Sequence, residues 1–378
     1  MGKKRLNGEG SVYLRSSDGM WIGSVSIGHN GEGKPIRKTV SAKTAEAARE
    51  KLRLVQRQLG DGLPVPDDRM TIEQLLDRWE KDILRHRVAP TTYDNYKSLA
   101  DSHIVPSLGR KRVAKLTPAD VDGLISEKFD SGLSSSTVSR IRNVLSQAID
   151  QAVRWGIVGR NIVTLSRPPK GVRTTSRALT PEQAKRFLKA IRGDRLEGLW
   201  VTMLYLGLRP GEVRGLTWDA VDLKGGVLVV KQAAIGSGKD TSIGPVKTAT
   251  SRRSVNLPAP VIAALRQQKK KQAEDRLAAR SSWTDLGLVF PNEVGKPIDS
   301  SNLRRDFSAA CDRAGLGHWH PHELRHSAAS LMLEQKVPIE VVSDVLGHST
   351  IRMTADVYGH IRTPQRQLAA EAMTEALS

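Results

Sequence analysis

The sequence has little of what a secreted, membrane or metal-dependent protein needs. It holds one cysteine, Cys311, among 378 residues, so no intramolecular disulfide can form, and this is typical of a reducing cytoplasm. No apolar run approaches the roughly 20 residues that cross a bilayer. No apolar stretch follows the basic residues 1–5, so we expect no signal peptide and a cytoplasmic protein. Clustered cysteines or carboxylates at metal-ligand spacing are also missing, which gives a metal-dependent nuclease poor support.

Acidic residues are outnumbered. The chain has 40 Asp and Glu against 59 Lys and Arg, for a formal charge of +19. A surplus of this size most often indicates a polyanionic partner, and nucleic acid is favoured over a membrane surface. The alternative is a basic protein that is merely soluble. The length allows two or three domains with their own cores.

The pattern along the chain predicts three domains joined by two linkers. Residues 1–60 alternate polar and apolar between Gly-containing turns and then become helical, which predicts three strands and a helix. Residues 61–70 are rich in Gly and Pro and form a linker. Residues 71–165 carry apolar side chains at helical spacing and predict four helices. After a basic, Pro-containing linker at 166–178, residues 179–378 predict a mixed α+β domain that ends in a tail helix. The expected fold class is therefore multidomain and mainly α.

Within the last domain, local signals place several elements. An apolar helix is expected to end at Gly207, and Pro210 fixes the backbone after Arg209. Residues 242–247 and 252–257 predict a hairpin with Lys247 at its tip. A further helix is expected to begin at Pro321, where proline suits the first helical position.

The last third of the chain concentrates groups that suit phosphate chemistry. They are two arginines, two histidines and a tyrosine: Arg209, His322, Arg325, His348 and Tyr358. Two guanidiniums can clamp a phosphodiester through paired hydrogen bonds. Histidines can donate to its oxygens or accept a proton, and a phenol can attack the phosphorus. This set suits phosphate chemistry that is done without a metal, and we expect no cofactor.

The same residues give the sequence its family resemblance. Arg209 is followed by Pro-Gly-Glu, His322 and Arg325 form a His-x-x-Arg box, His348 closes a Leu-Gly-His box, and Tyr358 follows ten residues later. This order and spacing resemble the tyrosine recombinases of the phage-integrase family. The resemblance covers nearly the whole chain, most strongly from Arg177 onward.

The resemblance implies a site-specific recombinase that cuts and rejoins double-stranded DNA through a 3′-phosphotyrosyl intermediate and a Holliday junction. Tyr358 would be the nucleophile and Lys247 the general acid, with Arg209, Arg325, His322 and His348 around the phosphate. Residues 1–60 would bind arm-type DNA sites and residues 71–165 the core site. Homotetramers on DNA, an excisionase and a DNA-bending host factor are the implied partners, in the nucleoid of a bacterial cell.

Several alternatives stay open from the sequence. A type IB topoisomerase shares this chemistry, and a catalytically inactive DNA-binding regulator could use the same scaffold. Lys247 can also be one more solvated lysine, and His326 a helix-packing histidine. Glu212 either orients Arg209 or lies on a helix surface. The sequence separates neither phage from plasmid or transposon origin nor one target site from another.

Overall fold

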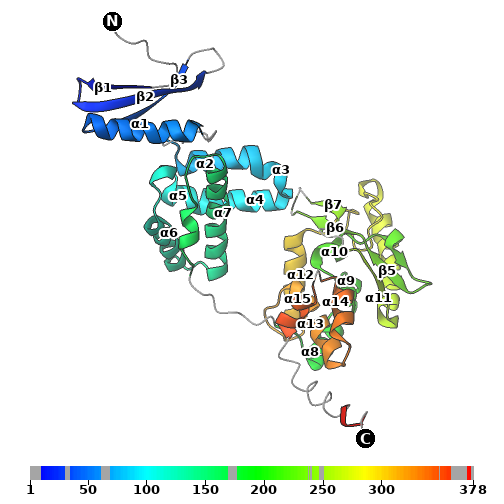
Figure 1. Cartoon of the computed structure of the whole chain (residues 1–378). Helices are drawn as coiled ribbons and strands as arrows, with labels where there is room; N and C mark the ends of the chain where they lie inside the picture. Colours follow the sequence, from blue (N-terminus) through cyan, green and yellow to red (C-terminus); the bar gives the residue numbers. More distant parts are fainter. Residues whose placement is uncertain are drawn as a thin grey trace. The chain divides into compact units, whose positions relative to one another are not determined.

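The computed structural model (Figure 1) describes residues 10–29, 35–60, 69–168, 177–236, 238, 241–246, 251–348, 350–358 and 373–375. The chain forms two compact units, Met1–Val172 and Arg173–Ser378. Lys247 and most of the predicted tail helix lie outside the described residues, although residues 373–375 are helical.

The first unit begins with an antiparallel three-stranded sheet and one helix, as the sequence predicted. The strands pair in the order β1-β2-β3, and the helix α1 packs against β2. Their bounds are β1 Ser11–Arg15, β2 Met20–His29, β3 Pro35–Ala42 and α1 Ala45–Gly60. Ile22 and Val25 on the sheet and Ala48 and Leu52 on the helix are buried. Gly23 and Val25 are two positions apart and share one face of β2, and a Cβ on Gly23 would meet Ala48 and Leu52, so this face packs against α1.

The rest of the first unit is helical. Its α-helices are α2 Ile72–Trp79, α3 Arg85–Arg87, α4 Pro90–Leu99, α5 Val105–Leu108, α6 Pro118–Asp130 and α7 Ser135–Arg154. Thr71 and Thr117 each form a capping box at the start of α2 and α6, which fixes where these helices begin. The four longer helices α2, α4, α6 and α7 are those that the sequence predicted.

The second unit holds eight further helices among its described residues. They are α8 Pro181–Ala190, α9 Glu197–Leu206, α10 Pro210–Arg214, α11 Ala259–Ala279, α12 Ser300–Arg313, α13 Pro321–Glu334, α14 Ile339–Leu346 and α15 Ile351–Tyr358. Helix α13 begins at Pro321, as expected. In the part of the chain that the structure describes, no helix is long and apolar enough to cross a membrane.

The strands of the second unit form two small sheets, and here one prediction was wrong. The strands are β4 Val221–Asp222, β5 Val227–Val230, β6 Gln232–Ile235, β7 Ser242–Pro245 and β8 Arg253–Asn256. We expected β7 and β8 to form a hairpin. Instead β7 pairs with β6, and β8 pairs with β5 in the sheet β4-β5-β8. Both β7 and β8 thus pair with a strand that precedes them in the chain. These partners, β6 and β5, are consecutive strands.

The core of the second unit fixes the position of α9. The rings of Phe187 and Phe307 pack edge to face with centroids 5.6 Å apart, and Trp200 of α9 lies 5.2 Å from Phe307. Nearly every residue of α9 is buried. Because interiors are close-packed, this helix holds the chain that follows it, which begins at Gly207, in one place.

Candidate active site

The site begins at the junction between α9 and α10. Gly207 ends α9 with φ of +61°, a left-handed conformation that favours glycine. Arg209 then occupies the N-cap position of α10, and Pro210 is the first residue of that helix. The proline ring restricts φ and removes a donor that would be unsatisfied at this position. The Arg209 side chain therefore extends from a rigid turn of the backbone.

A buried carboxylate orients Arg209. Glu212 is 4% exposed, and its Oε1 accepts a hydrogen bond from Arg209 Nη1 at 2.7 Å while Oε2 accepts one from the Arg209 backbone N–H at 3.0 Å. Arg253 of β8 donates to the same carboxylate, from Nη2 at 2.9 Å and Nη1 at 3.2 Å. Burial would raise the pKa of Glu212, but these two guanidiniums outweigh it and hold the pKa below its usual value. Glu212 is thus an orienting residue, and the helix-surface alternative is excluded.

Two arginines cross-link the elements of the site through backbone carbonyls. Arg209 Nη2 donates to the carbonyl of Gly347 at 3.0 Å, and Arg325 Nη1 donates to the carbonyl of Gly207 at 2.9 Å. Both glycines end helices in the left-handed conformation. A Cβ on Gly347 would lie 2.9 Å from Arg253 Nη1, so only glycine fits there without displacing that arginine. The contacts bring α10, α13 and the end of α14 to one point.

The two arginines differ in exposure. Arg325 is 3% exposed, whereas the Arg209 side chain is 31% exposed. Two of the five donors of the Arg209 guanidinium bind Glu212 and Gly347, which leaves others for an external oxygen.

His348 follows Gly347 directly, and its ring contacts a threonine six positions further along the chain. Its Nδ1 lies 2.7 Å from the hydroxyl of buried Thr354 in α15. This contact leaves Nε2 as the nitrogen for a reaction partner. Burial, together with the charges of Arg325 and Arg209, lowers the pKa of His348 to about 4, so the ring is neutral at neutral pH.

His322 and His326 lie one turn apart on α13, with ring centroids 5.1 Å from each other at a steep angle. Partial desolvation by the surrounding protein lowers the pKa of His322, and the neighbouring His326, Arg325 and Arg209 act in the same direction. His322 as a whole residue is nevertheless exposed to solvent. Burial and Arg325 also lower the pKa of His326.

These histidines predict a pH-dependent stability. Each is neutral in the folded chain, whereas an unfolded histidine takes a proton near pH 6.5. As pH falls from about 6.5 toward 4, the unfolded state therefore binds more protons than the folded state. The contribution of these histidines to the free energy of unfolding is present above this window and is lost within it. We expect His348→Gln to take up about one proton fewer on unfolding near pH 5 than the wild type. The slope of the free energy of unfolding against pH, obtained from denaturation at several pH values, measures this difference.

The matched control is His86→Gln on the exposed surface of the first unit, measured over the same pH range. Equal slopes for the wild type and His348→Gln would show that His348 is protonated in the folded state.

The structure thus brings together Arg209, His322, Arg325 and His348 of the six predicted catalytic residues. Lys247 lies outside the described residues. The backbone of Tyr358 ends α15, and its side chain is outside the described part of the structure. Among the described residues, no group of three or more His, Cys, Asp or Glu side chains could hold a metal ion.

Sequence reasoning missed Arg253 and Thr354. Arg253 is 7% exposed at its side chain and donates from Nε to the carbonyl of Val345 at 2.6 Å. A lone arginine on the inward face of a short strand was the available signal, because a buried charge needs a partner. Nothing in the sequence around Thr354 distinguishes it from a helix-surface threonine.

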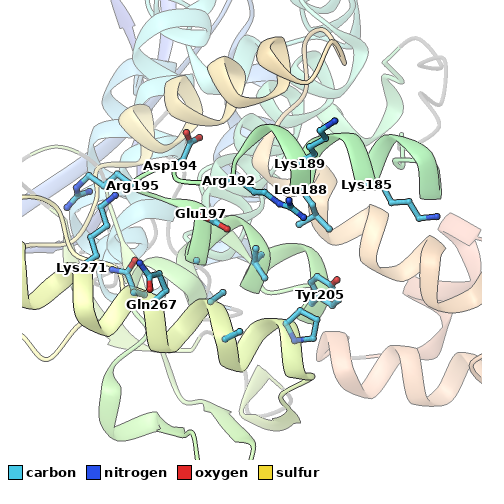
Figure 2. A pocket seen from close by; sticks show the side chains of 16 residues that line it. Lys185, Leu188, Lys189, Arg192, Asp194, Arg195, Glu197, Tyr205, Gln267 and Lys271 are labelled. Carbon is cyan, nitrogen blue, oxygen red and sulfur yellow. The ribbon is translucent and has the colours of Figure 1, made fainter.

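The second unit has other cavities besides the space around this cluster. One of about 620 Å³ lies between α8, α9 and α11. Figure 2 shows Lys185 and Lys189 of α8 on one side of it and Gln267 and Lys271 of α11 on the other. None of the described predicted catalytic residues lines it, so we give it no part in the reaction.

The fold matches solved structures of DNA-integration enzymes. A Tn1549 transposon integrase in complex with a circular intermediate DNA superposes with a TM-score of 0.69 at 22% identity, over 82% of this chain and 100% of that one. A lambda integrase tetramer bound to a Holliday junction gives 0.58 at 20% identity, over 92% and 97%. The chain therefore has the fold of the tyrosine-recombinase integrases.

Sequence comparison gives the family. Residues 177–364 match the phage integrase family, and residues 71–129 match the phage integrase N-terminal SAM-like domain. An integrase of Streptomyces ambofaciens is 35% identical over 380 residues, which cover 99% of this chain and 97% of the relative. A tyrosine recombinase XerC-like protein of Caldanaerobacter subterraneus subsp. tengcongensis is 29% identical over 382 residues, covering 96% and 98%. The chain belongs to the phage integrase family and is a tyrosine-type site-specific recombinase of a mobile element.

Proposed function

We propose that this recombinase cuts and rejoins double-stranded DNA at attachment sites through a 3′-phosphotyrosyl bond at Tyr358, and that strands are exchanged through a Holliday junction. The observation that supports it best is the cross-linked cluster of Arg209, Arg325 and His348. It concentrates fixed positive charge and neutral imidazole at one point. Such a cluster can stabilise the negative charge that develops on a phosphodiester during attack.

The proposed chemistry assigns each residue one task. The phenol oxygen of Tyr358 attacks the scissile phosphorus, and its proton passes to a neutral imidazole, for which His348 Nε2 is our choice. Arg209 and Arg325 stabilise the charge that grows on the non-bridging oxygens, and His322 donates to the same oxygens. The P–O5′ bond breaks, and Lys247 gives a proton to the departing 5′ oxygen. A 5′ hydroxyl from a second strand then reverses these steps, which needs neither ATP nor a metal ion.

The proposal extends to the rest of the chain. Residues 1–60 would bind arm-type sites, residues 71–165 the core site, and residues 179–378 would carry catalysis, with linkers at 61–70 and 166–178. A β-ribbon of the N-terminal sheet can enter a major groove, and the charge of +19 suits the phosphate backbone. We expect a homotetramer on DNA, assisted by an excisionase and a DNA-bending host factor, acting on the nucleoid in a bacterial cytoplasm.

The test is a suicide substrate: an attachment-site DNA nicked so that the cleaved end diffuses away. We expect the wild type to form a covalent protein–DNA complex that persists in EDTA and without ATP, seen as a shifted band under denaturing conditions. Loss of the band in EDTA would contradict the metal-free mechanism. Absence of any band on DNA that the protein demonstrably binds would favour a DNA-binding regulator. Relaxation of supercoiled DNA with one site would favour topoisomerase-like activity.

A further inference from the structure

The last residue of α10 is a buried arginine with no task in the proposed chemistry. Arg214 is 4% exposed, and its Nε donates to the carbonyl of Ile298 at 2.6 Å. Its Nη2 is buried and has no hydrogen-bond partner among the described residues. A buried donor without an acceptor on a charged group is costly, so an external acceptor that binds this guanidinium would stabilise the folded chain.

Arg214 lines a cavity of about 1150 Å³ between α10, β6, α12 and α13. Arg304 of α12 and Arg177 are also on its wall, as are three histidines, His320, His322 and His326. The carboxylate on this wall, Glu323, is already bound to Arg177 by two hydrogen bonds of 3.1 and 3.2 Å. Neither Arg214 nor Arg304 forms an ion pair with a described carboxylate.

The electrostatic surroundings of Arg214 favour an anion. Burial lowers the pKa of Arg214; the charge of Asp299 opposes this and that of Arg304 adds to it. Asp299 is occupied at the start of α12, where its Oδ1 accepts from the backbone N–H groups of Ser301 and Asn302. A bound anion would offset the desolvation of Arg214 more directly than Asp299 does.

The cavity adjoins the catalytic cluster. His322 lines it and also feels the charges of Arg209 and Arg325. Pro210, which follows Arg209 in the chain, is on its wall as well. A nucleic-acid strand held at the cluster can therefore place a neighbouring phosphate in this cavity, since phosphates repeat about every 3.4 Å along the axis of one strand.

We propose that this cavity binds a second backbone phosphate of the cleaved DNA strand, adjacent to the scissile one, with the buried Arg214 guanidinium as its main donor and Arg304 at the exposed rim. The inference rests on the proposed function. The bond to Ile298 fixes the Arg214 guanidinium before DNA arrives, and charge-assisted hydrogen bonds to phosphate are strong in a partly dry site. Holding two neighbouring phosphates sets the register of the strand, so that the scissile phosphorus meets the nucleophile. Arg214 is thus a positioning residue.

The test replaces single phosphates of the nicked DNA by uncharged methylphosphonates at each position flanking the cleavage site. We expect one position at which this slows covalent-complex formation by the wild type about 10-fold or more. Arg214→Gln should react about 10-fold more slowly on unmodified DNA and should be insensitive to the substitution at that position. Arg305→Gln, an exposed arginine that does not line this cavity, should behave as the wild type.

A folded Arg214→Gln that keeps the wild-type sensitivity at every position would overturn the inference. If Arg214→Gln does not fold, Arg304→Gln should reduce sensitivity at the same single position, and an unchanged profile there would count against the cavity. If the wild type forms no covalent complex on any nicked site, the proposed function fails first. Equilibrium binding then decides the cavity alone: Arg214→Gln should lower the slope of log affinity against log salt by about 0.9, and an unchanged slope rejects it.

Discussion

A Tyr358→Phe variant is expected to form no covalent protein–DNA complex on a nicked attachment site, because its ring has no hydroxyl to attack phosphorus. Binding to the same DNA should stay within about twofold of the wild type, since the change removes one oxygen at the end of α15. The covalent band and a gel-shift titration, measured on the same protein preparation, separate these two effects.

The matched control for this change is Tyr205→Phe, which removes the same oxygen from an exposed tyrosine of α9. It should form the complex at the wild-type rate. A band that survives in Tyr358→Phe would keep the reaction class and move the nucleophile to another residue.

Removal of the Glu212 carboxylate is expected to have the largest effect on stability. Glu212→Ala leaves Arg253 buried without its carboxylate and Arg209 without its orienting bonds. Breaking a buried ion pair by deleting one partner costs about 3–5 kcal/mol, which urea unfolding measures. We also expect covalent-complex formation to slow by about 10²–10³-fold, the effect typical of losing one preorganised charge donor.

Two further variants serve as a surface control and as a test of the Glu212 charge. Glu334→Ala, at the exposed end of α13, should change the free energy of unfolding by no more than about 0.5 kcal/mol. Glu212→Gln keeps one acceptor oxygen and should lie between the wild type and Glu212→Ala in both measurements. A Glu212→Ala protein as stable as the wild type would mean that Arg253 finds another partner.

The sequence predicted most helices of this fold because their signals are local. Threonine caps before α2, α6 and α8 and the proline at the start of α13 act within one turn. Strand pairing was predicted less well. The alternation in β7 and β8 identifies each as a strand but carries no information about its partner, so the expected hairpin was wrong.

The same distinction holds for the site. Arg209, His322, Arg325 and His348 could be found because they stand in short boxes with fixed spacing. Arg253 could not, since its bonds reach Glu212, 41 positions upstream, and Val345, 92 positions downstream. Arg214 was missed for a similar reason: its importance comes from a carbonyl 84 positions away and a cavity that exists only in the fold.

The arginine-to-carbonyl bonds limit how this scaffold can lose its activity during evolution. Arg209 and Arg325 bind the carbonyls of Gly347 and Gly207 and also have a role in the proposed chemistry, so we expect a change of either arginine to weaken the fold together with the proposed catalysis. Tyr358 is the last residue of α15, and the proposed chemistry gives its hydroxyl the single task of nucleophile. A descendant that turns into a silent DNA-binding protein should therefore lose its tyrosine first and keep its arginines. If the proposed chemistry is right, intact arginines in a relative indicate a stable domain, whereas the tyrosine indicates activity.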